Sequence, residues 1–224
     1  MKSGQSPGSL KSFENRRFYA FIDTAYLRGR ACGDLAKALC DGGADVVQIR
    51  AKDLSEDGIL RMAETVKPVT DGASVALVIN DSPNVARKVG ADAVHLGQDD
   101  FFHRGYQRAE EVTGIPAKTG LGLSTHSPEQ AARAVAAGPD YIAIGPVFAT
   151  PTKPGRPPVS LDYVRWAATN VTLPWFAIGG ITLQNLDDVL AAGATRICVV
   201  SAVLNADDTA KACREFTKRL ASRS

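Results

Sequence analysis

A fourfold internal repeat is the feature that most limits what this chain can fold into. Each copy has small residues around a glycine, a short polar turn and an apolar run, and the glycines are 47, 48 and 55 residues apart. Such a period is typical of stacked supersecondary units. A second set of apolar segments lies between the copies, so each repeat is predicted to contain two strands. The repeat copies are 41–50, 88–97, 136–145 and 191–200, and the second set is 18–23, 74–80, 119–124 and 174–180.

The segments between these strands are predicted to be helices. Their apolar residues recur at three- and four-residue intervals, and Ser160 and Asp207 lie where two of the helices would be capped. Eight strands alternating with helices predict a single α/β domain, a (β/α)8 TIM barrel over residues 16–221 that follows a flexible N-terminal extension, 1–15. An open doubly wound sheet is the alternative, but no G-x-G-x-x-G follows the first strand.

Charge and hydrophobicity exclude several classes of protein. With 26 basic and 24 acidic side chains, the net charge is +2, which does not indicate a basic surface that binds nucleic acid. The longest uncharged run, 166–186, is too polar for a membrane span, and the first dozen residues lack a signal-peptide core, so a cytoplasmic protein is expected. Cys32, Cys40, Cys198 and Cys213 have no C-x-x-C spacing and are expected to be reduced, buried thiols.

Polar residues at the ends of the predicted strands are the candidate site, because a TIM barrel has its active site at the carboxyl ends of its strands. Gln48, Arg50 and Lys52 alternate at the end of the second strand, and a period of two puts them on one face. An amide beside two cations suits a phosphate or pyrophosphate. The alternative is a solvated polar rim.

Carboxylates follow the next two strands. Asn80-Asp81 ends the third strand, and the loop after the fourth contains Asp99-Asp100. Magnesium favours one or two carboxylates together with phosphate oxygens, so a divalent ion is predicted between these residues and a phosphorylated ligand. Asn80-Asp81 can also be interpreted as a cap of the following helix.

The loops after strands six to eight predict a second anion site. The segment 145–158 is long and rich in proline and carries hydroxyls and cations, which favours a functional loop over a connector. Gly179-Gly180 and Val200-Ser201 follow the last two strands, where this fold commonly binds phosphate. No two histidines have metal-ligand spacing, so zinc is not predicted, and structural roles are expected for His95 and His126.

Taken together, these motifs resemble the thiamine phosphate synthase family from about residue 18 to 219. The resemblance implies a magnesium-dependent transferase that condenses 4-amino-2-methyl-5-hydroxymethylpyrimidine pyrophosphate with 4-methyl-5-(2-hydroxyethyl)thiazole phosphate, giving thiamine phosphate and pyrophosphate. The motifs that carry it, in order, are Gln48-x-Arg50-x-Lys52, Ile79-Asn80-Asp81, His95-Leu96-Gly97-Gln98-Asp99-Asp100, Gly145-Pro146-Val147-Phe148 with Thr150-x-Thr152-Lys153, and Gly179-Gly180-Ile181.

The resemblance also implies a role for each matching residue. Asp81 and Asp100 would hold Mg2+, and Ser124 would contact the leaving pyrophosphate. Catalysis would depend on Arg50, Lys52, Ser124 and Lys153. The pyrimidine pyrophosphate would be bound by Gln48, Arg50, Lys52, Asn80 and Lys153, and the thiazole phosphate by Thr150, Thr152, Gly180, Val200 and Ser201.

The sequence departs from the family pattern at three positions. Ala51 stands where the family often has Glu, Ser82 where it often has Arg, and Ala149 where it often has Pro. None of them removes a residue expected to bind a ligand, so loop geometry rather than activity is in question.

Two other functions stay open at this point. One is a thiazole tautomerase-like paralogue that would use His126 for proton transfer, and the other is a non-catalytic sensor of thiamine precursors. The expected partners are phosphorylated small molecules, with no nucleic acid and no membrane. The sequence does not decide whether the chain forms a homo-oligomer.

Overall fold

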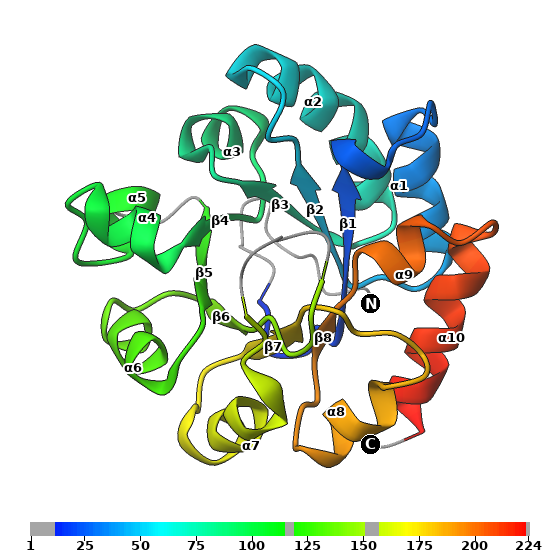
Figure 1. The fold of residues 1–224 in the computed structure, drawn as a ribbon. Coiled ribbons are helices and arrows are strands. Elements are labelled where there is room, and N and C mark those ends of the chain that lie inside the picture. The colour runs from blue at the N-terminus through cyan, green and yellow to red at the C-terminus, as the bar shows by residue number, and fades with distance from the viewer. Residues whose placement is uncertain (1–11, 115–118, 151–156, 223–224) are drawn as a thin grey trace, which may run out of the picture.

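The described residues form a closed barrel of eight parallel strands, in which each strand pairs with the next and β8 returns to β1 (Figure 1). A computed structural model describes residues 12–114, 119–150 and 157–222. The predicted barrel is therefore confirmed, and the open doubly wound sheet is excluded. The strands are β1 Phe18–Asp23, β2 Val46–Arg50, β3 Ala76–Asn80, β4 Ala93–Gly97, β5 Gly120–Thr125, β6 Tyr141–Ile144, β7 Trp175–Ile178 and β8 Ile197–Cys198.

Helices surround the strands as an outer ring (Figure 1). They cover the outward faces of strands that are buried on both sides, which explains the nearly continuous apolar runs in the sequence. The helices are η1 Thr24–Tyr26, a 3-10 turn, and the α-helices α1 Cys32–Asp41, α2 Glu56–Gly72, α3 Pro83–Val89, α4 Gln98–His103, α5 Glu110–Thr113, α6 Pro128–Ala136, α7 Ser160–Asn170, α8 Leu186–Ala191, α9 Ser201–Leu204 and α10 Thr209–Ala221. No helix in the described part of the chain is long and apolar enough to span a membrane.

The repeat in the sequence has a structural cause at the amino-terminal end of the barrel. The repeat glycines Gly43, Gly90, Gly138 and Gly193 have φ values of 86°, 65°, 75° and 100°, a left-handed conformation that favours glycine. In three copies an aspartate follows and its carboxylate accepts hydrogen bonds from amides of the neighbouring odd-numbered strand. These bonds join Asp45 to the amides of Arg17 and Phe18, Asp92 to Leu77 and Asp140 to Leu121, at 2.7–2.9 Å.

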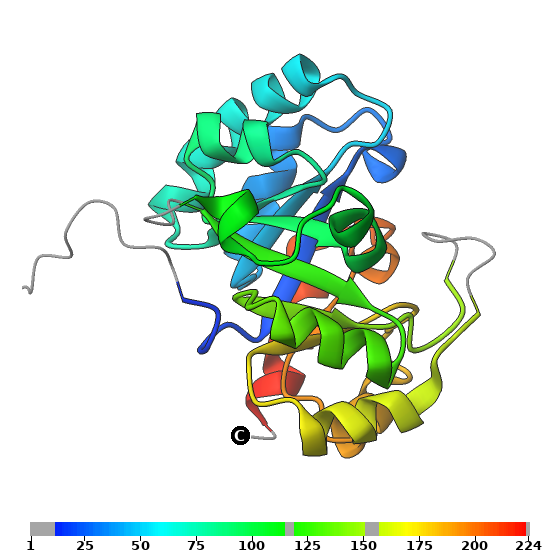
Figure 2. The ribbon, with the colours of Figure 1, turned by 90° about the vertical axis from the view of Figure 1, so that its left-hand side faces the viewer.

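A phenylalanine before β1 extends the core at the amino-terminal end of the barrel. Phe13 is 4% exposed, and its ring centroid lies 4.5 Å from that of Tyr141. Figure 2 shows the chain before β1 at the opposite end of the barrel from η1. Phe13 lies within the predicted N-terminal extension, of which residues 1–11 are outside the described residues.

Several local predictions were wrong. Helix α7 begins at Ser160 itself, whose hydroxyl accepts from the amide of Asp162, and Asp208 rather than Asp207 caps α10, because the Asp208 carboxylate reaches the Lys211 amide at 2.8 Å. The segment after β4 is the helix α4, not a loop. All four cysteines are free, but only two are fully buried, Cys198 and Cys213, while Cys32 and Cys40 are partly exposed.

Candidate active site

Among the described residues, the predicted site residues lie at or just beyond the carboxyl ends of the strands, and most of them line two adjoining cavities. One cavity is bordered by Gln48, Arg50 and Asn80, and the other by His126, Thr150 and Gly180. The two cavities share the lining residues Ser124, Ala143, Ile178, Cys198 and Val200. The two cavities therefore adjoin, and Ser124 lies in the lining of both.

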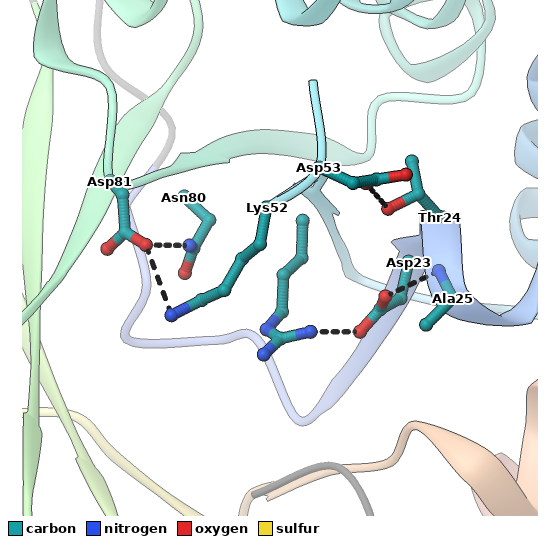
Figure 3. Close-up of polar contacts among 8 residues, drawn as sticks. Asp23, Thr24, Ala25, Lys52, Asp53, Asn80 and Asp81 are labelled. Carbon is teal, nitrogen blue, oxygen red and sulfur yellow. Dashed lines mark hydrogen bonds and ion pairs between the residues drawn. The ribbon is translucent and has the colours of Figure 1, made fainter. Parts of the chain in front are cut away.

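An ion pair holds Arg50 at the edge of the first cavity. Arg50 Nη1 lies 2.7 Å from Asp23 Oδ2, and the two residues are register partners at the ends of β1 and β2. The Asp23 side chain is 1% exposed and also accepts from the Ala25 amide at 3.1 Å (Figure 3). Asp23 was missed by the sequence analysis, although the rule that identified Arg50, a charged residue that ends a buried strand, applies to it equally.

Lys52 lies beyond the end of β2, at the rim. Its Nζ is 3.7 Å from Asp81 Oδ2, and the two side chains are 59% and 35% exposed (Figure 3). The prediction that Gln48, Arg50 and Lys52 share one strand face holds only for the first two, because β2 ends at Arg50 and both Gln48 and Arg50 line the first cavity.

Asp81 is held by its neighbours rather than by the following helix. Its Oδ2 accepts from Asn80 Nδ2 at 2.6 Å, and its amide donates to the His95 carbonyl at 2.9 Å. Ser82 takes the N-cap position of α3, so the interpretation of Asn80-Asp81 as that cap is wrong. Asp81 has a φ of 64°, which is uncommon outside glycine and is found at strained functional sites.

Asp100 belongs to the first turn of α4 and is turned back over the end of β4. A Cβ added to Gly97 would lie 2.8 Å from Asp100 Oδ2, so the carboxylate occupies the space that a side chain would fill. Because β3 and β4 are paired, Asp81 and Asp100 follow adjacent strand ends. We refer to Arg50, Lys52, Asn80, Asp81 and Asp100 as the charged half of the site.

Three glycines, Gly145, Gly179 and Gly180, line the second cavity. Gly179 and Gly180 have φ values of 105° and 64°, and a Cβ on Gly179 would lie 2.4 Å from Pro146 Cβ. The Phe148 amide donates to the Gly179 carbonyl at 3.0 Å, which joins the loops after β6 and β7. We refer to Gly145, Gly179, Gly180, Val200 and Ser201 as the glycine half of the site; all five line the cavity.

The remaining predicted residues fall into three groups. Thr150 lines the second cavity, whereas Thr152 and Lys153 lie outside the described residues. His126 lines the same cavity, and its Nδ1 contacts the Gly145 carbonyl oxygen. Of the departures from the family pattern, Ala51 and Ser82 are buried and Ala149 is exposed.

His95 lies inside the barrel in a chain of polar contacts rather than as an isolated core residue. Its Nε2 is 2.7 Å from Ser124 Oγ, and its Nδ1 is 3.0 Å from Tyr141 Oη. Tyr141 Oη is 2.9 Å from Tyr19 Oη, which accepts from Gln48 Nε2 at 2.6 Å. Sequence alone could not indicate this chain, because its members come from β1, β2, β4, β5 and β6.

Comparisons with known proteins agree on one family. A family model described as thiamine monophosphate synthase matches residues 18–203. The thiamine-phosphate synthase of Thermus thermophilus is 49% identical over 180 residues, covering 80% of this chain and 84% of that protein. The thiamine-phosphate synthase of Acidothermus cellulolyticus is 42% identical over 216 residues, covering 94% of this chain and 98% of that protein.

Solved structures give the same result for the fold. The thiamine phosphate pyrophosphorylase from Pyrococcus furiosus superposes with a TM-score of 0.80 at 29% identity, covering 92% of this chain and 96% of that one. A 3-hexulose-6-phosphate synthase, at 19% identity and a TM-score of 0.62, covers 90% of this chain and 98% of that one and shows a likeness of fold alone.

Proposed function

This chain belongs to the thiamine monophosphate synthase family, and we propose that it condenses hydroxymethylpyrimidine pyrophosphate with thiazole phosphate to give thiamine phosphate and pyrophosphate. The family resemblance inferred from the sequence motifs is thereby confirmed. The observation that supports this reaction best is the pair of adjoining cavities, one lined by Gln48, Arg50 and Asn80 and the other by three glycines, with Ser124 in both. Such a site suits two phosphorylated substrates that must meet.

The charged half would take the pyrimidine pyrophosphate. Arg50 and Lys52 would contact the pyrophosphate oxygens, with Lys153 as a third cation, while Gln48 and Asn80 would hold the pyrimidine. Support comes from the ion pair with Asp23, which fixes one end of the Arg50 guanidinium and leaves its other N–H groups available as donors. The Arg50 side chain is 16% exposed, so it also faces little competition from water.

The glycine half would take the thiazole phosphate. Backbone amides next to residues without side chains can approach a phosphate closely. Asn185 Nδ2 donates to the Gly180 carbonyl at 2.9 Å, which restrains the loop after β7. The residues proposed to bind are Thr150, Thr152, Gly180, Val200 and Ser201.

Catalysis would consist mainly of stabilising the leaving group. Pyrophosphate bound to the exocyclic carbon of an electron-rich aminopyrimidine can depart before the nucleophile arrives, in a dissociative, carbocation-like step. Arg50, Lys52, Ser124 and Lys153 would stabilise the charge on the departing oxygens, and the two cavities would hold the thiazole nitrogen close to the reacting carbon. This nitrogen already has its lone pair, so the protein needs no general base.

Asp81 and Asp100 are proposed to hold Mg2+. The two carboxylates fit this ion because both are hard oxygen donors at adjacent strand ends, and the lack of a side chain at Gly97 leaves room for the Asp100 carboxylate over the end of β4. The described residues contain no group of three or more metal-ligating side chains, so water and substrate oxygens would complete the coordination. When bound, the ion would neutralise charge on the pyrophosphate.

The decisive experiment is an assay of pyrophosphate release with both substrates and Mg2+. Release that depends on both substrates supports the proposal. A tautomerase-like paralogue would release none but would exchange protons on the thiazole, and a sensor would bind the ligands without turnover. We place the reaction in the cytoplasm and in one catalytic domain, residues 16–221, with phosphorylated small molecules as partners.

A further inference from the structure

Two residues proposed to touch different parts of the substrate are joined by buried hydrogen bonds. Gln48 stands at one end and Ser124 at the other, with Tyr19, Tyr141 and His95 between them, at 2.6, 2.9, 3.0 and 2.7 Å along the chain. All five residues are less than 9% exposed. The tyrosines and His95 have no role in the proposed reaction, so that reaction does not explain why these five side chains are hydrogen-bonded to one another.

The tyrosines remain protonated, so each has one proton to donate. Burial inside the barrel is the largest cause that raises the pKa of Tyr19 and of Tyr141 well above the usual value. A phenol in this state can accept from one neighbour and donate to the next.

The Gln48 end fixes the direction in which the protons point. Gln48 Nε2 can only donate, so Tyr19 accepts and gives its own proton to Tyr141. Tyr141 then donates to His95 Nδ1, which must carry no proton. The opposite direction would leave the Tyr19 hydroxyl with two donors and its own proton without an acceptor among the residues that the structure describes.

A neutral imidazole with an unprotonated Nδ1 carries its proton on Nε2. That nitrogen lies 2.7 Å from Ser124 Oγ, so His95 donates and Ser124 accepts. The Ser124 proton is then directed away from His95, and Ser124 lines both cavities.

We propose that this series of hydrogen bonds sets the direction of its protons, so that Tyr19 and Tyr141 hold His95 as its Nε2–H tautomer. Ser124 thereby becomes a hydrogen-bond donor to the departing pyrophosphate. Tyr19, Tyr141 and His95 are positioning residues that act through Ser124. A donor fixed before reaction costs no reorganisation when charge develops on the leaving group. The tautomer follows from the hydrogen bonds alone, whereas the effect on catalysis rests on the proposed function.

The tautomer can be measured directly. Two-bond 1H–15N correlation spectra of the full chain labelled with 15N-histidine distinguish the two neutral tautomers and the imidazolium. Spectra of His103→Gln and His126→Gln assign the His95 signals by elimination. We expect His95 with a protonated Nε2 and an unprotonated Nδ1 in the unliganded protein near neutral pH.

Tyr141→Phe tests the link to catalysis. This variant removes the hydroxyl but keeps the ring, which packs against Phe13 and Phe176 with centroids 4.5 and 5.5 Å away. We expect the Nε2–H preference of His95 to be lost and kcat to fall about tenfold, the effect of one lost hydrogen bond, while the KM for thiazole phosphate stays within about twofold.

Tyr163→Phe is the matched control. Tyr163 is 5% exposed and donates to Thr125 Oγ1 at 2.8 Å, so the variant loses a buried, hydrogen-bonded hydroxyl that lies outside the series from Gln48 to Ser124. It should leave the His95 spectrum and kcat unchanged.

Three results would overturn the proposal: a wild-type His95 protonated on Nδ1 or on both nitrogens, a Tyr141→Phe variant with unchanged spectrum and kcat, or equal losses in both variants. If Tyr141→Phe fails to fold, the wild-type spectrum still decides the tautomer. An inactive wild-type protein with the expected tautomer would refute the proposed function but not the proton order.

Discussion

The charged half and the glycine half of the site, each proposed to bind an anion, are built in different ways. The charged half relies on side chains whose positions are set by ion pairs and hydrogen bonds, such as Arg50 with Asp23 and Asp81 with Asn80. The glycine half relies on a backbone shape, with φ values of 105° and 64° at Gly179 and Gly180. A shorter side chain at Arg50 adds no atom that could clash, whereas a Cβ at Gly179 would lie 2.4 Å from Pro146 Cβ.

This difference predicts how each half responds to substitution. Removal of a charged side chain should affect one ligand and leave the barrel folded, because the residue lies at the mouth. A change in the glycine half should affect both ligand binding and stability, because the same backbone that faces the ligand joins two loops of the barrel.

The largest effect is expected for the carboxylates of the charged half. Asp81→Asn or Asp100→Asn should lower turnover by about a hundredfold or more, since each would remove a charged ligand of Mg2+. Steady-state assays of pyrophosphate release over a range of Mg2+ concentrations measure the effect. Retained activity in both variants at limiting Mg2+ would contradict the metal assignment.

Asp188→Asn serves as the control for this pair. Asp188 is an exposed carboxylate in the first turn of α8, so it matches Asp100 in its place on a helix but lies outside the charged half. Its substitution should leave turnover and the Mg2+ dependence unchanged.

Arg50→Ala should have the next largest effect, on the pyrophosphate ligand alone. Loss of charge-assisted hydrogen bonds of about 1.5–3 kcal/mol weakens pyrophosphate binding by about ten- to a hundredfold. Calorimetric titration with inorganic pyrophosphate and with thiazole phosphate measures both affinities. Equal losses for the two ligands would show that the two anion sites are misassigned.

Arg50→Ala also leaves the Asp23 carboxylate unpaired at 1% exposure, which is itself destabilising. Arg50→Lys keeps a cation beside Asp23 but loses the planar fork, so it separates the two effects. The free energy of unfolding of Arg50→Lys should lie within about 1 kcal/mol of the wild-type value. Its affinity for pyrophosphate should still be lower than that of the wild type.

Gly179→Ala tests the glycine half. Its Cβ would lie 2.4 Å from Pro146 Cβ, so the loops after β6 and β7 must separate. We expect the affinity for thiazole phosphate to fall about tenfold and the free energy of unfolding to fall by about 1–3 kcal/mol, with pyrophosphate binding unaffected. Urea denaturation and calorimetry measure these quantities.

Gly72→Ala is the contrasting glycine variant. Gly72 lies at the end of α2, has no atom within 4 Å of a built Cβ and has no left-handed φ. Alanine there should stabilise the protein by about 0.5–1 kcal/mol and leave ligand binding unchanged. If both glycine variants behaved alike, the backbone explanation of the glycine half would fail.

The fold could be predicted from the sequence because its signal is local and repeated. Each repeat glycine needs a left-handed turn and three of the repeats add a carboxylate that binds neighbouring amides, so the same signal recurs around the barrel. The strand ends followed from the same pattern, and with them the positions of Arg50 and Asp81. Their roles stay predictions until ligands are tested.

The parts that could not be predicted depend on contacts across the barrel or on the choice between neighbouring residues. The chain from Gln48 to Ser124 joins side chains far apart in sequence, and no periodicity encodes which of them meet. Whether Asp207 or Asp208 caps α10 depends on backbone angles that either residue could adopt. The α4 helix is a short segment of six residues, too brief for apolar periodicity to reveal.

The smallest effect is expected for Asp23→Asn, and it concerns the support of the charged half rather than its ligands. The amide oxygen can still accept from Ala25, but the charge that holds Arg50 is lost. Two consequences oppose each other: Arg50 becomes a freer cation, which favours an anion, and its fork loses its orientation. We therefore expect pyrophosphate affinity to change by less than about threefold while kcat falls about fivefold, because orientation matters most in the transition state. Asp53→Asn is the matched control, since Asp53 contacts Thr24 (Figure 3), whereas the ion-pair partner of Arg50 among the described residues is Asp23. Steady-state kinetics with both substrates varied gives kcat and each KM. An unchanged kcat in Asp23→Asn, or an equal fall in Asp53→Asn, would mean that Asp23 serves the fold and not the position of Arg50.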